Sequence, residues 1–250
     1  MYNRLFTFGC SFTNYTWYTW ADIINYDLGI PYQNWGISGI GNRGIHARLI
    51  ECNIKNKLTK KDLIIVQWSS WTREDRYINN SWQVGGNIFS STNERYDKMF
   101  LKKYWDVNND IIQNSTAIIS AQSLPITFQL SVPLTYESIL GLDDIDDKMY
   151  TTYKTALPKD IFYIPEYKGQ YPDSHPDILN HLDFVKHIYK KIGFEIKKET
   201  VDYFSKKHND IIATIKEAKT DDWDLVLRKT GLGNYKVIDC GWGSDFHWHG

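Results

Sequence analysis

The sequence has few cysteines, almost no net charge and no long apolar run. Its three cysteines are scattered over 250 residues, which excludes a disulfide framework or a paired-cysteine zinc site and favours a reducing, cytoplasmic compartment. Lys and Arg total 29 against 30 Asp and Glu, a net charge of −1, so nucleic acid and acidic membranes are not expected partners. No segment approaches the ~20 apolar residues of a membrane span, and the first eight residues are too short and too β-like for a signal peptide.

The sequence is instead rich in aromatic residues, with 10 Trp, 17 Tyr and 11 Phe. At this density aromatic side chains fill cores, and they also stack on sugars and line partner surfaces. One group begins at the end of the third predicted strand and continues after it: Trp68, Trp71, Tyr77, Trp82, Phe89, Tyr104 and Trp105. Core packing is the simplest role for most of this group, and an acyl or sugar pocket is the functional alternative.

Apolar patterning predicts an alternation of strands and helices. A continuous apolar run over residues 62–69 indicates a strand buried on both faces, as in a parallel sheet. Further strands are predicted over 5–12, 32–35, 126–132 and 160–164, and helices over 17–28, 42–57, 176–192 and 199–219, with two more between 93 and 123 and one within the acidic stretch 136–157. Residues 71–93 are interpreted as a long surface excursion. The alternation predicts an α/β fold with a doubly wound parallel sheet, in which ligands bind at the carboxyl ends of the strands.

Two of these strand ends carry candidate site residues. In Phe8-Gly9-Cys10-Ser11-Phe12, a serine in the tight turn after a buried strand holds its hydroxyl out of the sheet, which is the logic of a nucleophile elbow. The alternative is a turn serine that caps the next helix. The glycines of Asn34-Trp35-Gly36-Ile37-Ser38-Gly39 let the backbone approach a ligand and point N–H groups at it. A structural turn is the alternative there.

A third candidate lies late in the chain, in Tyr171-Pro172-Asp173-Ser174-His175-Pro176. An aspartate and a histidine two residues apart on one loop can place a carboxylate against the imidazole and leave the other ring nitrogen free. A general base needs that arrangement. The pattern also occurs widely without a catalytic role.

Taken together, these three blocks resemble those of the SGNH (GDSL-like) hydrolases in order and spacing over residues 4–192. The resemblance implies a flavodoxin-like three-layer α/β/α domain over residues 1–193 and a serine esterase or acylhydrolase that needs no metal or other cofactor. By the same resemblance, Ser11 is the nucleophile, His175 and Asp173 complete the triad, and the N–H of Gly39 serves the oxyanion hole. The aromatic-rich stretch of about 71–123 is then an insertion, and 194–250 is a carboxy-terminal extension.

The sequence departs from the family pattern at two places. Cys10 stands where the family usually has a non-catalytic aspartate. After the central strand, the family's Gly-x-Asn is replaced by Gln67-Trp68-Ser69-Ser70-Trp71-Thr72-Arg73, so the usual asparagine donor to the oxyanion is missing. Because neighbouring parallel strands end together, we expect Ser69 or Ser70, or failing them Arg73, to point into the Ser11 pocket and replace it.

Several other features suggest weaker hypotheses. A reactive Cys10 would need a depressed pKa, and a metal site in Asp245-Phe246-His247-Trp248-His249 would need more convergent ligands than a chain terminus offers. His181 resembles a histidine often seen after the third block, and packing is its expected role. The sequence is rich in Asn, Ile, Lys and Tyr, and its third block reads Trp-Ser-Ser. In these two respects it resembles SGNH hydrolases that are carried by phages.

The resulting hypothesis is a serine esterase that cleaves an O-acyl ester through Ser11, His175 and Asp173. The favoured substrate is O-acetylated carbohydrate, since a near-neutral, aromatic-rich loop suits a sugar. One alternative is an O-acyltransferase that uses the same residues with an alcohol in place of water. A non-catalytic glycan-binding or virion-associated module is the other, and the missing asparagine favours it.

Overall fold

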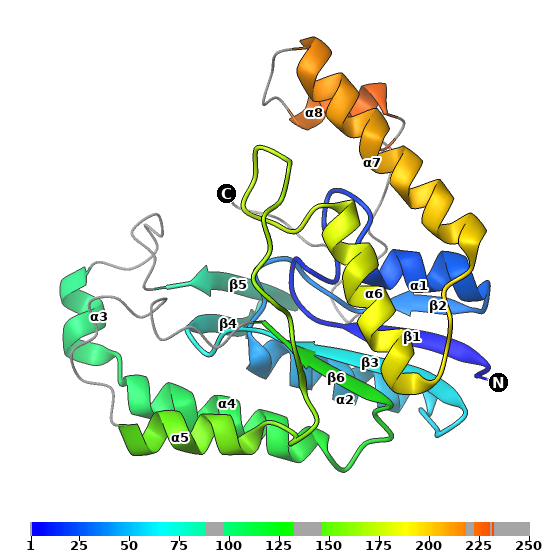
Figure 1. The fold of residues 1–250 in the computed structure, drawn as a ribbon. Helices are drawn as coiled ribbons and strands as arrows, with labels where there is room; N and C mark the ends of the chain where they lie inside the picture. The colour runs from blue at the N-terminus through cyan, green and yellow to red at the C-terminus, as the bar shows by residue number, and fades with distance from the viewer. Residues whose placement is uncertain (1, 89–97, 133–146, 219–222, 231, 233–250) are drawn as a thin grey trace.

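The computed structural model describes residues 2–88, 98–132, 147–218, 223–230 and 232. At its centre is a five-stranded sheet in the order β2-β1-β3-β6-β7, in which neighbouring strands run parallel (Figure 1). These strands are β1 (Arg4–Phe8), β2 (Tyr32–Asn34), β3 (Asp62–Trp68), β6 (Phe128–Ser131) and β7 (Phe162–Tyr163). In chain order this is the 2-1-3-4-5 arrangement of flavodoxin-like sheets. The predicted α/β fold class is therefore confirmed.

Helices cover both faces of the sheet (Figure 1). They are α1 (Trp20–Leu28), α2 (Asn42–Asn56), α3 (Lys98–Tyr104), α4 (Val107–Ala121), α5 (Asp147–Ala156), α6 (Ile178–Ile192), α7 (Lys198–Ala218) and α8 (Trp223–Lys229). Successive strand side chains point to opposite faces, so Leu5 and Phe6 lie in different core clusters. The cluster of Leu5 takes residues from α1, α6, α7 and α8, and that of Phe6 takes residues from α2, α4 and α5. The structure thus has three layers.

Strand β3 is the buried centre of the sheet, and all of its residues are buried as its continuous apolar run predicts. Phe8 at the end of β1 pairs with Val66 of β3. The chain therefore leaves β1 at Gly9 and β3 at Ser69 on the same edge of the sheet. Ligands bind at this edge in folds of this class.

Capping residues fix where two of the helices begin and end. Helix α1 begins at Trp20, later than the apolar pattern alone predicts, because the Asp22 carboxylate accepts the Thr19 N–H at 2.8 Å and makes Thr19 the N-cap. Asp177 caps α6 by accepting the Asn180 N–H at 2.9 Å. Gly193 ends α6 with φ +75°, the left-handed conformation that glycine adopts readily.

The surface excursion predicted over residues 71–93 is wrong over most of its length. Strands β4 (Arg73–Ile78) and β5 (Ser81–Asn87) form an antiparallel hairpin. Its two-residue turn is Asn79-Asn80, and both residues have positive φ, 52° and 62°, as a tight hairpin turn requires. Asparagine tolerates this conformation, so the Asn-Asn pair was the available signal. The strands themselves are polar and half-exposed, so their sequences lack the alternation of apolar and polar residues that usually reveals a strand.

Residues beyond Gly193 share the core of the amino-terminal strands. Phe204, Ile211, Val226 and Leu227 belong to the same cluster as Leu5, and α7 packs against α6 and α1.

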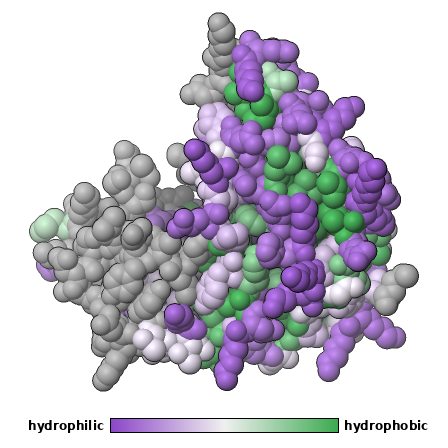
Figure 2. Space-filling view, viewed as in Figure 1, coloured by the Kyte–Doolittle hydropathy of each residue, from purple (hydrophilic) through white to green (hydrophobic). Residues whose placement is uncertain are grey.

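Figure 2 shows hydrophilic side chains over much of one face of the molecule. Within the described part of the chain, no helix combines the length and apolarity of a membrane span. The tail residues that were weighed as a weaker hypothesis for a metal site, 245–249, lie outside the described residues.

Candidate active site

Ser11 lies in a tight turn directly after β1. The N–H groups of Thr13 and Asn14 both donate to the Cys10 carbonyl, at 2.8 and 3.1 Å, and close the turn. Gly9 enters it with φ +156°, and a Cβ at this position would lie 2.1 Å from Thr13 Oγ1. Only glycine fits so close an approach. The Ser11 side chain sits in this turn with 2% of its surface exposed.

His175 and Asp173 reach Ser11 from the loop that precedes α6. His175 Nε2 lies 2.9 Å from Ser11 Oγ. On the other side of the ring, His175 Nδ1 lies 2.6 Å from Asp173 Oδ1, which also accepts the His175 backbone N–H at 2.7 Å. With Nδ1–H donating to the carboxylate, Nε2 is free to accept from the serine hydroxyl. The structure brings together the three residues that the sequence singled out.

The surroundings of this group favour a neutral imidazole beside a carboxylate. Burial lowers the pKa of His175 below its ordinary value, Asp173 opposes that shift, and the positive charge of Arg73 adds to it. Burial by itself raises the pKa of Asp173, but donors on His175 and Tyr15 outweigh burial and hold it below its ordinary value. Neutral His175 is the form that can take a proton from Ser11.

The glycine-containing loop after β2 is tied to the Ser11 turn. The Ile37 N–H donates to the Gly9 carbonyl at 2.9 Å, and the Ile40 N–H closes a turn onto Ile37 at 3.2 Å. Gly39 lies inside this turn with φ +83°. The N–H groups of Ser11 and Gly39 donate to no acceptor among the described residues.

The residues after β3 have different surroundings. The side-chain amide of Asn42 forms two hydrogen bonds with the Ser69 backbone. Its oxygen accepts the Ser69 N–H at 2.7 Å, and its nitrogen donates to the Ser69 carbonyl at 3.0 Å. The Ser69 hydroxyl is buried without a partner in the described part of the chain. Ser70 Oγ lies 2.7 Å from Thr72 Oγ1, which engages that hydroxyl.

Arg73 is the residue of this block whose charge acts on His175. Its guanidinium donates to the Ile40 carbonyl at 3.3 Å, which holds it over the loop that contains Gly39. No carboxylate within the described ranges pairs with it. Arg73 therefore places a positive charge near His175, over the loop that contains Gly39.

Sequence reasoning missed two aromatic neighbours of His175. The ring of Tyr15 stacks on the imidazole at a centroid distance of 4.0 Å, and Phe12 meets it edge-on at 5.8 Å. Both belong to the aromatic run that follows Ser11, and this run was the available signal.

His181 is buried and packs edge-on against Phe184. The Cys10 thiol is buried too and accepts from Gln67 Nε2 at 3.4 Å.

Strand order and site geometry together identify the architecture. The Ser11 turn, the Gly39 loop and the Asp173–His175 loop meet at one edge of a 2-1-3-4-5 parallel sheet. This is a flavodoxin-like three-layer α/β/α architecture.

Comparisons with known proteins find similarity among solved structures only. No family model matches the chain, and no curated protein matches it. TesA is 11% identical, with 76% of this chain and 98% of that chain covered and a TM-score of 0.42. A lipolytic protein of the G-D-S-L family from Veillonella parvula is 15% identical, with 76% and 97% covered and a TM-score of 0.42. The acetyl xylan esterase Est2A from Butyrivibrio proteoclasticus is 14% identical, with 77% and 65% covered and a TM-score of 0.41. Nothing about the substrate of this chain follows from them.

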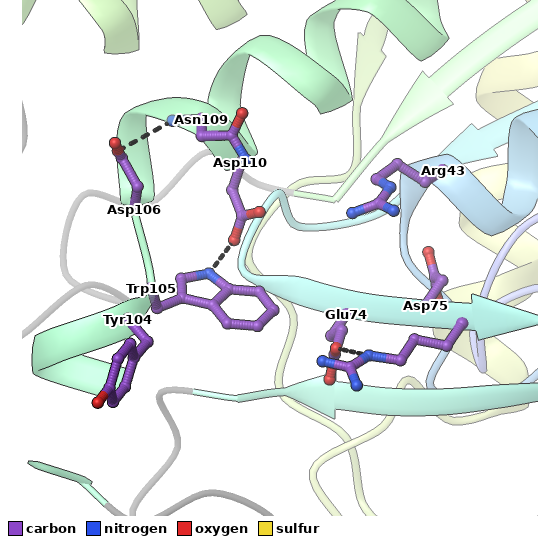
Figure 3. A pocket seen from close by; sticks show the side chains of 9 residues that line it. Arg43, Glu74, Asp75, Tyr104, Trp105, Asp106, Asn109 and Asp110 are labelled. Carbon is purple, nitrogen blue, oxygen red and sulfur yellow. Dashed lines mark hydrogen bonds and ion pairs between the residues drawn. The ribbon is translucent and has the colours of Figure 1, made fainter. Parts of the chain in front are cut away.

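A separate polar pocket lies between the β4–β5 hairpin, α2 and the α3–α4 segment, and none of its lining residues belongs to the Ser11 group (Figure 3). Trp105 donates to Asp110 on one side of it, and Arg76 pairs with Glu74 on the other. Burial raises the pKa of Asp110 to about 6. In the described ranges no group of three or more His, Cys, Asp or Glu side chains can hold a metal ion.

Proposed function

We propose that this protein is a serine esterase of the SGNH superfamily that cleaves an O-acyl ester. The observation that carries the proposal is the continuous chain from Ser11 Oγ to His175 Nε2, at 2.9 Å, and from His175 Nδ1 to Asp173 Oδ1, at 2.6 Å. A nucleophile, a base and a group that orients the base are the minimum that this chemistry needs.

The proposed reaction has two halves. Neutral His175 takes the proton of the Ser11 hydroxyl as Oγ bonds to the acyl carbon, and the imidazolium then protonates the departing alcohol oxygen as the carbon–oxygen bond breaks. Water attacks the resulting acyl-serine while His175 accepts its proton. His175 returns that proton to Ser11 Oγ as the acid leaves. Asp173 stays ionised throughout and stabilises the imidazolium.

The negative oxygen of the tetrahedral intermediate needs donors, and the Ser11 and Gly39 amides are the proposed pair. The usual asparagine is absent from the segment after β3. Arg73 is the proposed replacement, because its guanidinium carries no carboxylate partner among the described residues and its charge acts on His175. A charged donor is stronger than a serine hydroxyl.

The proposed substrate is a small acyl ester, an O-acetyl group on a carbohydrate. Aromatic side chains surround the base, with Phe12 and Tyr15 against His175 and Tyr167 against Phe12. Aromatic side chains combine an apolar body with, in tyrosine, a polar tip, and this combination suits the mixed surface of a sugar. An acyltransferase would use the same three residues with a second alcohol in place of water.

A fluorophosphonate probe tests the proposal, since it labels only a serine activated by a base. We expect labelling of the wild type, loss of labelling in Ser11→Ala and His175→Ala, and unchanged labelling in Ser123→Ala, an exposed serine elsewhere. Release of acetate from O-acetylated xylooligosaccharide then defines the ester. An acetylated acceptor alcohol among the products would instead indicate a transferase. An unlabelled wild type would contradict both enzymes and favour the non-catalytic glycan-binding module.

A further inference from the structure

Tyr15 contacts both members of the proposed base at once. Its hydroxyl donates to Asp173 Oδ2 at 2.9 Å. Its ring lies over the His175 imidazole with a centroid distance of 4.0 Å and an interplanar angle of 23°. The edge of Trp17 meets the Tyr15 ring at 4.6 Å and fixes its position in turn.

The hydroxyl of Tyr15 completes the hydrogen bonding of the Asp173 carboxylate. Oδ1 accepts both donors of His175, and Oδ2 accepts Tyr15. Donors on both oxygens fix the carboxylate plane and spread its negative charge over three bonds. Burial, together with the neighbouring charge of Asp173 and the hydrogen bond to it, raises the pKa of Tyr15 far above its ordinary value. The Tyr15 hydroxyl therefore keeps its proton and stays a donor at neutral pH.

The ring of Tyr15 acts on the imidazole directly. A stacked aromatic face holds the imidazole plane, so Nε2 stays directed at Ser11 Oγ. When His175 takes up a proton, the same face lies against a cation and stabilises it. The hydroxyl has the opposite effect, because it withdraws charge from the carboxylate that stabilises the imidazolium.

We infer that Tyr15 is a positioning residue that sets both the orientation and the basicity of His175. This inference rests on the proposed function of Ser11 and His175. Arg73, Tyr167 and His181 are charged or titratable groups near the pair. None of these three has a hydrogen bond to Asp173 within the described residues, where its side-chain oxygens accept from His175 and Tyr15.

The test uses Tyr15→Phe, which keeps the stacked ring and removes only the hydroxyl. Asp173 then carries more of its charge towards His175, so the pKa of His175 should rise, by about half a unit or more. Titration of the His175 ring followed by nuclear magnetic resonance measures this pKa and needs no substrate. The ring signal of His175 is the one that is missing in His175→Gln. The acid limb of kcat/KM against pH should move up by the same amount. Tyr18→Phe is the matched control, since that hydroxyl pairs with Tyr203.

Tyr15→Leu removes ring and hydroxyl together, and kcat should fall about tenfold or more with KM little changed. Tyr15→Phe should recover most of that loss. An unchanged His175 pKa in Tyr15→Phe would overturn the inference even if the wild type hydrolyses esters. A shifted pKa in a protein that the fluorophosphonate never labels would support the Tyr15 contact and overturn the proposed function. Thermal melts check that each variant folds.

Discussion

Asp75 in strand β4 accepts the N–H of Gly41 at 2.7 Å, at the start of α2. Gly41 is the N-cap of this helix and has no side chain to satisfy the first amides. The other carboxylate oxygen accepts the Gly44 N–H at 2.9 Å. A residue more than thirty positions along the chain thus caps α2, and the hairpin is fixed to the loop that presents Gly39.

Replacing Asp75 by Ala should destabilise the protein by about 2 kcal/mol, because two buried N–H groups lose their acceptor. Urea unfolding at pH 8 measures this, where Asp75 is ionised although burial raises its pKa to about 6. Asp183→Ala, which removes an exposed ion pair with Lys186, should change the free energy of unfolding by less than about 0.5 kcal/mol. Equal effects of the two substitutions would contradict the capping role.

The rate of ester hydrolysis should depend on a single basic group. Because burial lowers the pKa of His175, kcat/KM should rise as His175 loses its proton, with a midpoint below the ordinary histidine value of 6.5. Arg73→Gln should move this midpoint up, since the positive charge of Arg73 lowers the pKa. A rate that stays flat from pH 5 to 8 would argue against a histidine base.

Arg73→Ala should lower kcat on a neutral acetyl ester by about tenfold or more with little change in KM, because it removes a donor used in the transition state. The assay belongs at pH 8, where His175 is neutral in both proteins. Ser70→Ala should have little effect on kcat because the Ser70 hydroxyl is already hydrogen-bonded to Thr72. Ser69→Ala tests the other serine that the sequence suggested as a donor. Arg43→Ala in the separate pocket is the control. If all three substitutions leave kcat unchanged, the oxyanion has only two donors.

Stability should fall in acid partly through His181. Burial lowers the pKa of this fully buried ring to about 3, so below pH 6.5 the unfolded chain binds a proton that the folded chain does not. Each pH unit below 6.5 then costs about 1.4 kcal/mol until the pH nears 3. His181→Phe should reduce the loss between pH 7 and 5 measured by urea unfolding. Exposed His187→Gln should leave the slope unchanged, and equal slopes for all three proteins would refute this prediction.

Elements with local signals could be predicted from the sequence. The apolar run of β3, the turn glycine before Ser11 and the Asp173–His175 pair can each be read within a few residues. The alternation of strands and helices predicted the α/β class, and the resemblance of the three blocks to those of a known family indicated which residues meet at one sheet edge. Apolar periodicity and turn chemistry depend on neighbours in the chain, which is why these predictions were possible.

Contacts between residues far apart in the chain come from the fold. Tyr15 reaches Asp173 across 158 positions, and Arg73 reaches Ile40 because the β4–β5 hairpin folds back over the loop after β2. No local pattern encodes these distances. They follow from the parallel strand order, which places the ends of β1, β2 and β3 together, and from the packing of a hairpin whose polar strands carry no clear apolar period.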